Sequence, residues 1–245
     1  VETVFCAPGN PGMKGVVPVP ASGVSELADF AAAEGIGLTM VGPEDPLCNG
    51  IVDVFRARGL RIVGPDRQAA QLEGSKAYAK DFMERHGLPT AACGVFADRG
   101  QALAYVRQQG APIVVKADGL AAGKGVTVAM SVEDAETAIV DCFAGAFGES
   151  GAEVVIEEFM EGEEVSLFVL CDGTDILPLT TAQDYKRAFD GDAGPNTGGM
   201  GAYSPAPVMT REIYEDVLER VIRPTVKGLA ARGTPYQGVL YAGLM

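Results

Sequence analysis

The sequence predicts an α/β fold for residues 1–74 and a mixed α+β fold for residues 75–245. Three observations favour this prediction. Short apolar runs alternate with amphipathic stretches through the first part, as in a doubly wound parallel sheet. In the second part, β-branched runs flank a glycine-rich segment, which is typical of an antiparallel hairpin. A hydrophobic content of 47% with 32 glycines fits an enzyme of strands and helices and argues against disorder.

The first part is predicted to alternate strands with helices. We expect strands at residues 1–7, 38–41 and 60–63 and helices at residues 24–34 and 51–58. Glycine-containing turns follow the first two strands, at residues 9–12 and 42–44. Open α/β sheets bind ligands at the carboxyl ends of their strands, so these turns are candidate ligand loops, although ordinary strand-to-helix turns explain them equally well. The spacing at residues 9–15 is not Gly-x-Gly-x-x-Gly, so a dinucleotide fingerprint is absent.

The character of the sequence changes between Pro65 and Ser75, and we place the domain boundary after residue 74. Ser75 is predicted to cap a helix that runs to His86 and ends at the following glycine. Further elements are expected as a strand at residues 92–96, a helix that begins at Asp98 with Gln101 completing a capping box, a strand at residues 112–117, and a helical stretch at residues 210–232 before a final strand.

The segment 113–130 is predicted to form a strand, a glycine loop and a second strand. It is not a P-loop, because Asp118 replaces the first glycine of that motif and β-branched alternation, not a helix, follows. The hairpin tip at residues 119–125 is instead expected to fold over phosphates and to donate backbone N–H groups. Lys116 lies in an otherwise apolar strand, where a charge is costly without an anionic partner. A lysine that faces solvent from a half-exposed strand is the alternative.

The segment 184–205 combines acids, a Lys-Arg pair, five glycines and two prolines, and we expect it to form no regular element. Glycines at residues 198, 199 and 201 allow backbone N–H groups to approach a small ligand. Lys186 and Arg187 supply charge that complements an anion. The segment is therefore a candidate ligand loop, and a solvated connection made of turn-forming residues is the alternative.

Composition excludes several classes of protein. A formal charge of −14 makes nucleic acid an unfavourable partner. The five cysteines contain no Cys-x-x-Cys pair, which indicates reduced thiols rather than disulfides or a zinc site. No apolar run reaches the length of a membrane span and no signal peptide opens the chain, so a cytoplasmic protein is expected. Both ends of the sequence look cut.

Several motifs in this order resemble known enzymes. A lysine on a strand, a glycine-rich hairpin and then Glu-Glu-Phe-x-x-Gly-Glu-Glu at residues 157–164 resemble the ATP-grasp superfamily. The Gln-Asp-Tyr-Lys-Arg run at residues 183–187 and the Gly-Gly-Met-Gly run at residues 198–201 are similar to the phosphoribosylamine-glycine ligase family in particular. Shorter matches at residues 7–10, 41–44 and 72–76 extend the resemblance over nearly the whole chain.

The resemblance implies a Rossmann-like pre-ATP-grasp domain followed by an ATP-grasp fold. It implies ligation of glycine to 5-phosphoribosylamine, with ATP cleaved to ADP and phosphate and glycyl phosphate as the intermediate, in de novo purine biosynthesis. The expected partners are these small molecules, with no nucleic acid and no membrane, and the oligomeric state is not predicted. Another ATP-grasp ligase of purine synthesis and a nucleotide-binding module without turnover are the alternatives.

The resemblance also implies roles for individual residues. Those expected to bind ATP are Lys76, Lys116, Gly119, Gly123, Lys124, Gly125, Glu157, Glu158, Phe159 and Glu164. Those expected to act in catalysis are Lys116, Asp184, Lys186 and Arg187. Those expected to bind the other substrates are Asn10, Gly42, Glu44, Gly198, Gly199, Met200 and Gly201.

Two features of the family are missing from this sequence. Nothing matches the opening Gly-x-Gly-Gly-Arg-Glu-His turn, and the Glu-Phe-Asn segment that binds Mg²⁺ or Mn²⁺ is absent. We therefore expect the metal ligands to lie beyond Met245, assign none within the chain, and expect the chain alone to turn over little.

Overall fold

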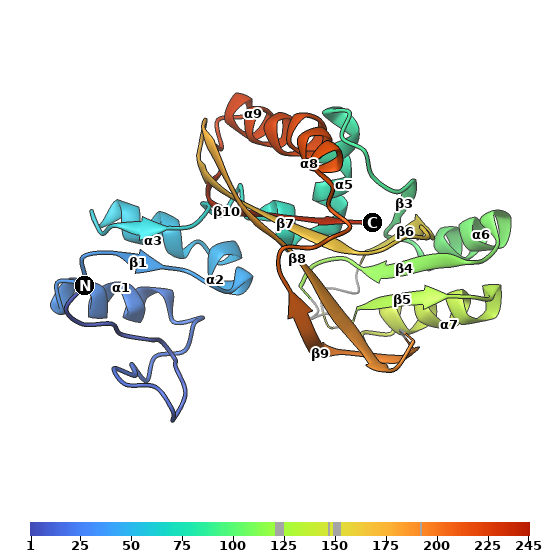
Figure 1. Cartoon of the computed structure of the whole chain (residues 1–245). Helices are drawn as coiled ribbons and strands as arrows, with labels where there is room; N and C mark the ends of the chain where they lie inside the picture. Colours follow the sequence, from blue (N-terminus) through green and yellow to red (C-terminus); the bar gives the residue numbers. More distant parts are fainter. Residues whose placement is uncertain (121–124, 147, 149–152, 192) are drawn as a thin grey trace.

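A computed structural model describes residues 1–245 except 121–124, 147, 149–152 and 192 (Figure 1). The elements of the first part are α1 (Val24–Ala33), β1 (Thr39–Met40), α2 (Glu44–Cys48), α3 (Ile51–Ala57), β2 (Ile62–Val63) and α4 (Gln71–Gly74). The next are α5 (Lys76–Arg85), β3 (Cys93–Phe96), α6 (Arg99–Gln109), β4 (Ile113–Ala117), β5 (Val126–Ala129), α7 (Val132–Phe143) and β6 (Val154–Glu158). The last are β7 (Val165–Asp172), β8 (Ile176–Phe189), β9 (Ala193–Tyr203), α8 (Arg211–Val217), a π-helical turn (Leu218–Ile222), α9 (Arg223–Ala231) and β10 (Gln237–Leu244).

The N-terminal region is a small α/β unit. Strands β1 and β2 pair in parallel, as expected from the alternating pattern. Helices α1 and α3 supply its core, in which Ala28, Val52 and Phe55 are almost fully buried. The strand expected at residues 1–7 was wrong: only an isolated bridge joins Cys6 to Val16, and Val4 is 71% exposed. An apolar run becomes a strand only when a neighbouring strand satisfies its backbone groups, and here none pairs with it.

The N-terminal region packs against strand β10. Arg56 donates a hydrogen bond of 2.6 Å to the side-chain oxygen of Gln237. Nearby, the backbones of Gly64 and Gly238 approach so closely that a Cβ atom on Gly238 would lie 3.1 Å from the Cα of Gly64. Gly238 also has a φ of +137°, which favours glycine. These contacts fix α3 and the turn after β2 against β10.

The smaller of the two four-stranded sheets is antiparallel, with the order β3-β6-β4-β5. Helices α6 and α7 cover one face, against which Ile113, Val115 and Ala117 are buried. Side chains alternate between the faces of a strand, so Lys116 lies on the face away from these helices. The hairpin expected at residues 113–130 is confirmed by the pairing of β4 with β5.

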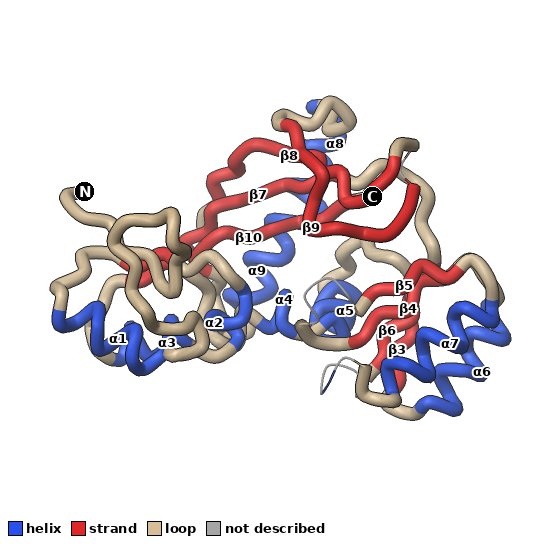
Figure 2. Tube along the Cα trace, turned by 90° about the horizontal axis from the view of Figure 1, so that it is seen from below, coloured by secondary structure: helices blue, strands red, loops and turns tan. Residues whose placement is uncertain are grey.

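The larger sheet has the order β10-β7-β8-β9 and is also antiparallel. Figure 1 shows α8 and α9 over one face of this sheet, and Figure 2 shows its four strands in one layer beside the smaller sheet. Leu167, Val169 and Leu229 are fully buried between this face and the helices. Phe168 and Tyr241 lie on the opposite face, where their rings stack with centroids 5.5 Å apart. That face is therefore the one available to a ligand.

The expectation that residues 184–205 form no regular element was wrong. They belong to the long hairpin of β8 and β9, in which Gln183 pairs with Tyr203 and Tyr185 with Gly201. The register shifts twice, between Tyr185 and Arg187 and again before Phe189. Glycine is unfavourable in regular strands but is tolerated at such irregularities, so this glycine-rich run completes a strand that pairs with β8.

Local signals in the sequence agree with the structure at the helix ends. The hydroxyl of Ser75 accepts a hydrogen bond from the backbone N–H of Tyr78, and Asp98 caps α6 in the same way through Gln101. The five cysteines are free thiols. Within the described residues, no helix combines the length and apolar character that a membrane span requires.

Candidate functional site

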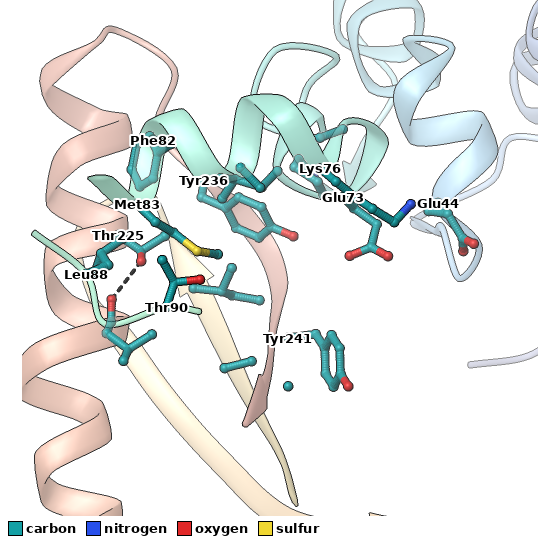
Figure 3. A pocket seen from close by; sticks show the side chains of 18 of the residues that line it. Glu44, Glu73, Lys76, Phe82, Met83, Leu88, Thr90, Thr225, Tyr236 and Tyr241 are labelled. Carbon is teal, nitrogen blue, oxygen red and sulfur yellow. Dashed lines mark hydrogen bonds between the residues drawn. The ribbon is translucent and has the colours of Figure 1, made fainter. Parts of the chain in front are cut away.

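A cleft of about 1150 Å³ lies where the three regions of the chain meet (Figure 3). Its lining includes side chains from the turn after β1, from α5, from the smaller sheet and from the open face of the larger sheet. Among them are Gly42, Glu44, Glu73, Lys76, Lys80, Lys116, Gly119, Gly125, Glu157, Phe168, Tyr236 and Tyr241. The cleft thus combines charged groups at one end with aromatic and aliphatic walls.

Lys116 and Glu157 form the central ion pair of the cleft. Lys116 pairs with Val155 across β4 and β6, so Glu157 is its diagonal neighbour on the same face. The ammonium nitrogen lies 2.8 Å from Oε2 of Glu157, and the side chains are 26% and 9% exposed. This contact supplies the anionic partner that a lysine in an apolar strand requires and excludes the solvent-facing alternative.

Lys80 is a second cation on Glu157 and was missed in the sequence analysis. Its ammonium lies 3.4 Å from Oε1 of Glu157 and donates hydrogen bonds of 2.8 Å to Thr90 Oγ1 and 3.0 Å to the carbonyl of Ala91. The signal was present in the sequence, because Lys80 follows Lys76 by four residues and therefore lies on the same side of the helix.

Lys76 joins helix α5 to the start of the hairpin tip. Its ammonium donates a hydrogen bond of 2.8 Å to the carbonyl of Gly119. The neighbouring Asp118 accepts hydrogen bonds from the hydroxyl of Ser75 and from the backbone N–H of Ala77. Burial lowers the pKa of Lys76 below its ordinary value, and the attraction of Asp118 offsets only part of this effect.

Two residues of the predicted hairpin tip, Gly123 and Lys124, lie outside the described residues. The two glycines that bound the tip, Gly119 and Gly125, both line the cleft. Gly119 is therefore anchored by Lys76, and both bounding glycines face the same cleft as Lys116.

The acidic end of the cleft contains Glu44 and Glu73 beside Lys76 (Figure 3). Burial raises the pKa of Glu73, the negative charge of Glu44 raises it further, and Lys76 acts in the opposite direction. Gly42 lines the cleft here as well. Asn10 does not: it is exposed and its side-chain oxygen accepts a hydrogen bond from the N–H of Gly12.

The residues of the segment expected to contact adenine do not all line the cleft. Of the three residues Glu157, Glu158 and Phe159, only Glu157 is part of the cleft lining, and Met160 lines it one residue beyond them. The Glu158 carboxylate accepts a hydrogen bond of 2.8 Å from the backbone N–H of Ala92, while its own N–H donates to the carbonyl of Ala92. The side chain of Glu158 therefore fastens β6 to the start of β3.

A second charged cluster lies on the β8–β9 hairpin, outside the lining of the cleft. The ammonium of Lys186 is 2.7 Å from Glu164 and 3.9 Å from Asp184. Burial opposes the charged form of Lys186, but the hydrogen bond and charge of Glu164 outweigh it, so the pKa of Lys186 is raised. Glu164 was expected near the ATP ribose, and here it belongs to the cluster of Lys186.

The rest of this hairpin is open. Arg187 donates a hydrogen bond of 3.5 Å to the carbonyl of Gly194, and Thr197 Oγ1 donates to the carbonyl of Lys186. Met200 is 62% exposed, and the three glycines around it are also exposed. Substituted Cβ atoms at these glycines, at residues 198, 199 and 201, would meet no atom within 4 Å.

Among the described residues, no group of three or more His, Cys, Asp or Glu side chains could hold a metal ion. The prediction that the metal ligands follow Met245 stays a prediction.

Comparison with known proteins places the chain in a family. The model of the phosphoribosylglycinamide synthetase N domain matches residues 1–73, and the model of the ATP-grasp (A) domain of the same enzyme matches residues 74–245. Phosphoribosylamine-glycine ligases of Escherichia coli O6:H1 and Vibrio vulnificus are 58% and 60% identical over the whole chain. The chain spans 58% of the length of each.

Solved structures of related proteins have similar folds. A phosphoribosylamine-glycine ligase from Thermotoga maritima has a TM-score of 0.70 and 37% identity over 76% of this chain and 47% of its own. A biotin carboxylase domain from Hydrogenobacter thermophilus in complex with MgADP has a TM-score of 0.67 and 20% identity over 93% of this chain and 49% of its own, which shows a shared fold. The chain belongs to the phosphoribosylglycinamide synthetase family, whose N domain and ATP-grasp domain it contains.

Proposed function

We propose that this chain is the ATP-binding part of an enzyme that joins glycine to 5-phosphoribosylamine, giving glycinamide ribonucleotide, ADP and phosphate. The observation that carries the proposal is the convergence of Lys76 and Lys116 in a cleft between two sheets that also has aromatic and aliphatic walls. Lysines beside such walls suit a nucleotide, whose phosphates need positive charge and whose base needs a flat apolar wall. The family membership makes ATP the nucleotide.

The chemistry explains why such a site is needed. A carboxylate does not react with an amine at neutral pH, so one glycine oxygen first takes a phosphoryl group from ATP. The amine then attacks the carbonyl carbon of glycyl phosphate, the C–O bond to phosphate breaks and the amine loses a proton. Water would hydrolyse the acyl phosphate, so the site has to be closed while the substrates are aligned.

The cleft residues have distinct parts in this proposal. Lys76 and Lys116 neutralise the phosphates, and the hairpin tip at residues 119–125, including Gly123 and Lys124, covers them. We assign the adenine contact to the segment of Glu157, Glu158 and Phe159, of which Glu157 lines the cleft together with Phe168 and Tyr241. Glu164 is assigned to the ribose, for which it has to leave Lys186. No protein general base is required, because phosphoryl transfer depends mainly on positioning and charge.

The other two substrates are assigned to the β8–β9 hairpin and to the turn after β1. We place glycine and the acyl phosphate beside Asp184, Lys186, Arg187 and residues 198–201, because a cation pair and a glycine-rich strand suit an anion. We place phosphoribosylamine at Gly42 and Glu44, with Asn10 as a further contact. Lys186 is paired with Glu164 in the free protein, so it has to exchange this partner for the anion.

The metal ion is assigned to the ATP phosphates and to no protein ligand. We propose that Mg²⁺ or Mn²⁺ accompanies the ATP phosphates and neutralises their charge. Asp and Glu side chains of the described part form no metal-binding group. We further propose that the enzyme acts in the cytoplasm on small molecules alone.

The test is a phosphate-release assay on the intact natural protein with ATP, Mg²⁺, glycine and phosphoribosylamine. The proposal predicts release that requires both glycine and the ribosylamine, with glycinamide ribonucleotide formed in equal amount. Release that needs bicarbonate or formate would indicate a different ligase. ATP binding without any release in the presence of all substrates would indicate a binding module.

A further inference from the structure

Lys80 is one of the most deeply placed cations in the described part of the chain, with a side chain only 10% exposed. Its ammonium contacts three acceptors: Thr90 and Ala91 before β3, and Glu157 on β6. Two of these contacts are hydrogen bonds and the third is an ion pair. Lys80 is therefore held in place on three sides.

Glu157 is shared between two lysines. Its Oε2 faces Lys116 and its Oε1 faces Lys80, while the side chain as a whole is 9% exposed. The two lysines are held to different degrees: Lys116 contacts Glu157 and is 26% exposed, whereas Lys80 is 10% exposed and is bound on three sides. If Lys116 leaves Glu157 for a phosphate, Lys80 remains as the cation beside this buried carboxylate.

A buried carboxylate without a cation beside it is costly, so it turns away toward solvent. We propose that Lys80 is a positioning residue that keeps the Glu157 carboxylate aimed into the cleft, so that Lys116 is free to bind a phosphate. This inference rests on the proposed function, since it assumes that a nucleotide occupies the cleft. It assigns Lys80 to the nucleotide site without any contact to the nucleotide.

The state of Glu157 has a consequence for base selection. An ionised carboxylate accepts hydrogen bonds and cannot donate them. The 6-amino group of adenine donates to such an acceptor, whereas the 6-oxygen of guanine is repelled by it. Loss of Lys80 should therefore weaken the preference for ATP over GTP. Loss of Lys116 should weaken the binding of ATP and of GTP to the same extent, because both carry the same phosphates.

The experiment measures dissociation constants of ATP and GTP by calorimetry in the intact natural protein. Lys80→Met keeps the length of the side chain and removes its charge, Lys80→Arg keeps the charge, and Lys227→Met removes an exposed lysine on α9 as the matched control. We expect the ATP-to-GTP preference to fall by about tenfold or more in Lys80→Met, in line with loss of a hydrogen bond to a charged group. Lys80→Arg should retain most of the preference and Lys227→Met all of it.

A double-substitution cycle with Glu157→Gln separates positioning from general stability. If Lys80 acts through Glu157, then Lys80→Met should not change the preference further once Glu157 is a glutamine. An equal drop in both backgrounds, or an unchanged preference in Lys80→Met, would overturn the inference. If Lys80→Met does not fold, Glu157→Gln alone should lower the preference while Lys80→Arg does not. Failure of the unsubstituted protein to bind ATP would overturn the proposed function as well, which distinguishes the two.

Discussion

The cleft and the β8–β9 hairpin each contribute a lysine that is paired with a glutamate at nearly the same distance. Lys116 lies 2.8 Å from Glu157 in the cleft, and Lys186 of the hairpin lies 2.7 Å from Glu164, which precedes β7. Their surroundings differ, because Glu157 is 9% exposed and Glu164 is 52% exposed. Distance alone therefore says little about what an ion pair does. The buried pair holds charges in place for a ligand, whereas solvent screens the exposed pair and leaves its groups free to move.

The pKa values of the two lysine sites shift in opposite directions. Burial dominates at Lys76 and lowers its pKa, and the attraction of Asp118 offsets only part of this effect. On the hairpin, Glu164 outweighs burial and raises the pKa of Lys186. A buried lysine whose charge is incompletely compensated is suited to an anionic ligand. The hairpin cluster is already compensated, so a ligand there has to displace an acid.

The largest expected effect is a difference in protein stability between substitutions in the two ion pairs. Glu157→Leu leaves the buried Lys80 and the partly buried Lys116 without their shared anion and should lower the free energy of unfolding by about 3 kcal/mol or more. Glu164→Leu, which removes the partner of Lys186, should change it by about 1 kcal/mol or less, because the pair is exposed. Urea titration of both variants measures the difference. Equal losses would show that burial does not distinguish the pairs.

The next effect concerns ATP. Lys116→Ala removes a charge-assisted contact to phosphate and should weaken ATP binding by about 1.5 to 3 kcal/mol. Lys186→Ala serves as the matched substitution on the hairpin and should leave ATP affinity nearly unchanged. Calorimetric titration of ATP into both variants decides between the regions. Unchanged affinity in Lys116→Ala would remove this residue from the nucleotide site.

A smaller effect tests the hairpin as the site of ligation. Gly199 has a φ of +115°, so Gly199→Val introduces backbone strain of about 1 to 2 kcal/mol although no atom crowds its Cβ position. We expect ligation to fall by about tenfold or more while ATP affinity is kept. Gly198→Val adds the same bulk at a residue without a positive φ. Equal loss of turnover in both variants would point to bulk rather than to backbone strain, and retained turnover in Gly199→Val would remove this strand from the site.

The smallest effect is a difference in pH dependence. The pKa of Lys76 is lower in the folded protein than in the unfolded chain. At pH values between these two pKa values, the unfolded chain binds more protons than the folded protein. The contribution of Lys76 to stability therefore increases with pH in this range. Its contribution to ATP affinity has the opposite sign, because the charge is lost as pH rises through the lowered pKa. Lys76→Arg should move the alkaline loss of ATP affinity to higher pH. For Lys186 the stabilisation is present below its ordinary pKa and is lost as pH rises through the raised value.

Local patterns predicted much of the fold. The caps at Ser75 and Asp98 marked helix starts, and the apolar run at residues 113–117 predicted the strand that carries Lys116. The requirement for an anionic partner also followed from burial of a charge in an apolar strand. The identity of that partner did not follow, because the diagonal register of β4 and β6 depends on a sheet whose strands are far apart in sequence.

The errors arose where distant pairing overrides local preference. Residues 1–7 look like a strand but have only one bridge, to Val16. Residues 184–205 look irregular because of their glycines, yet they complete a strand hairpin whose bulges accommodate them. Lys80 was missed for a related reason: a lysine on a helix usually faces solvent, and only the position of β6 shows that this one is buried against Glu157.

Amide hydrogen exchange with and without ATP tests the central claim most directly, since it reports where the nucleotide binds without any substitution. The account predicts slower exchange in peptides that cover α5, β4 and β6, with little change in peptides that cover the tip of the β8–β9 hairpin. Protection confined to the hairpin, with unchanged exchange around Lys76, Lys116 and Glu157, would contradict the assignment of the cleft as the nucleotide site.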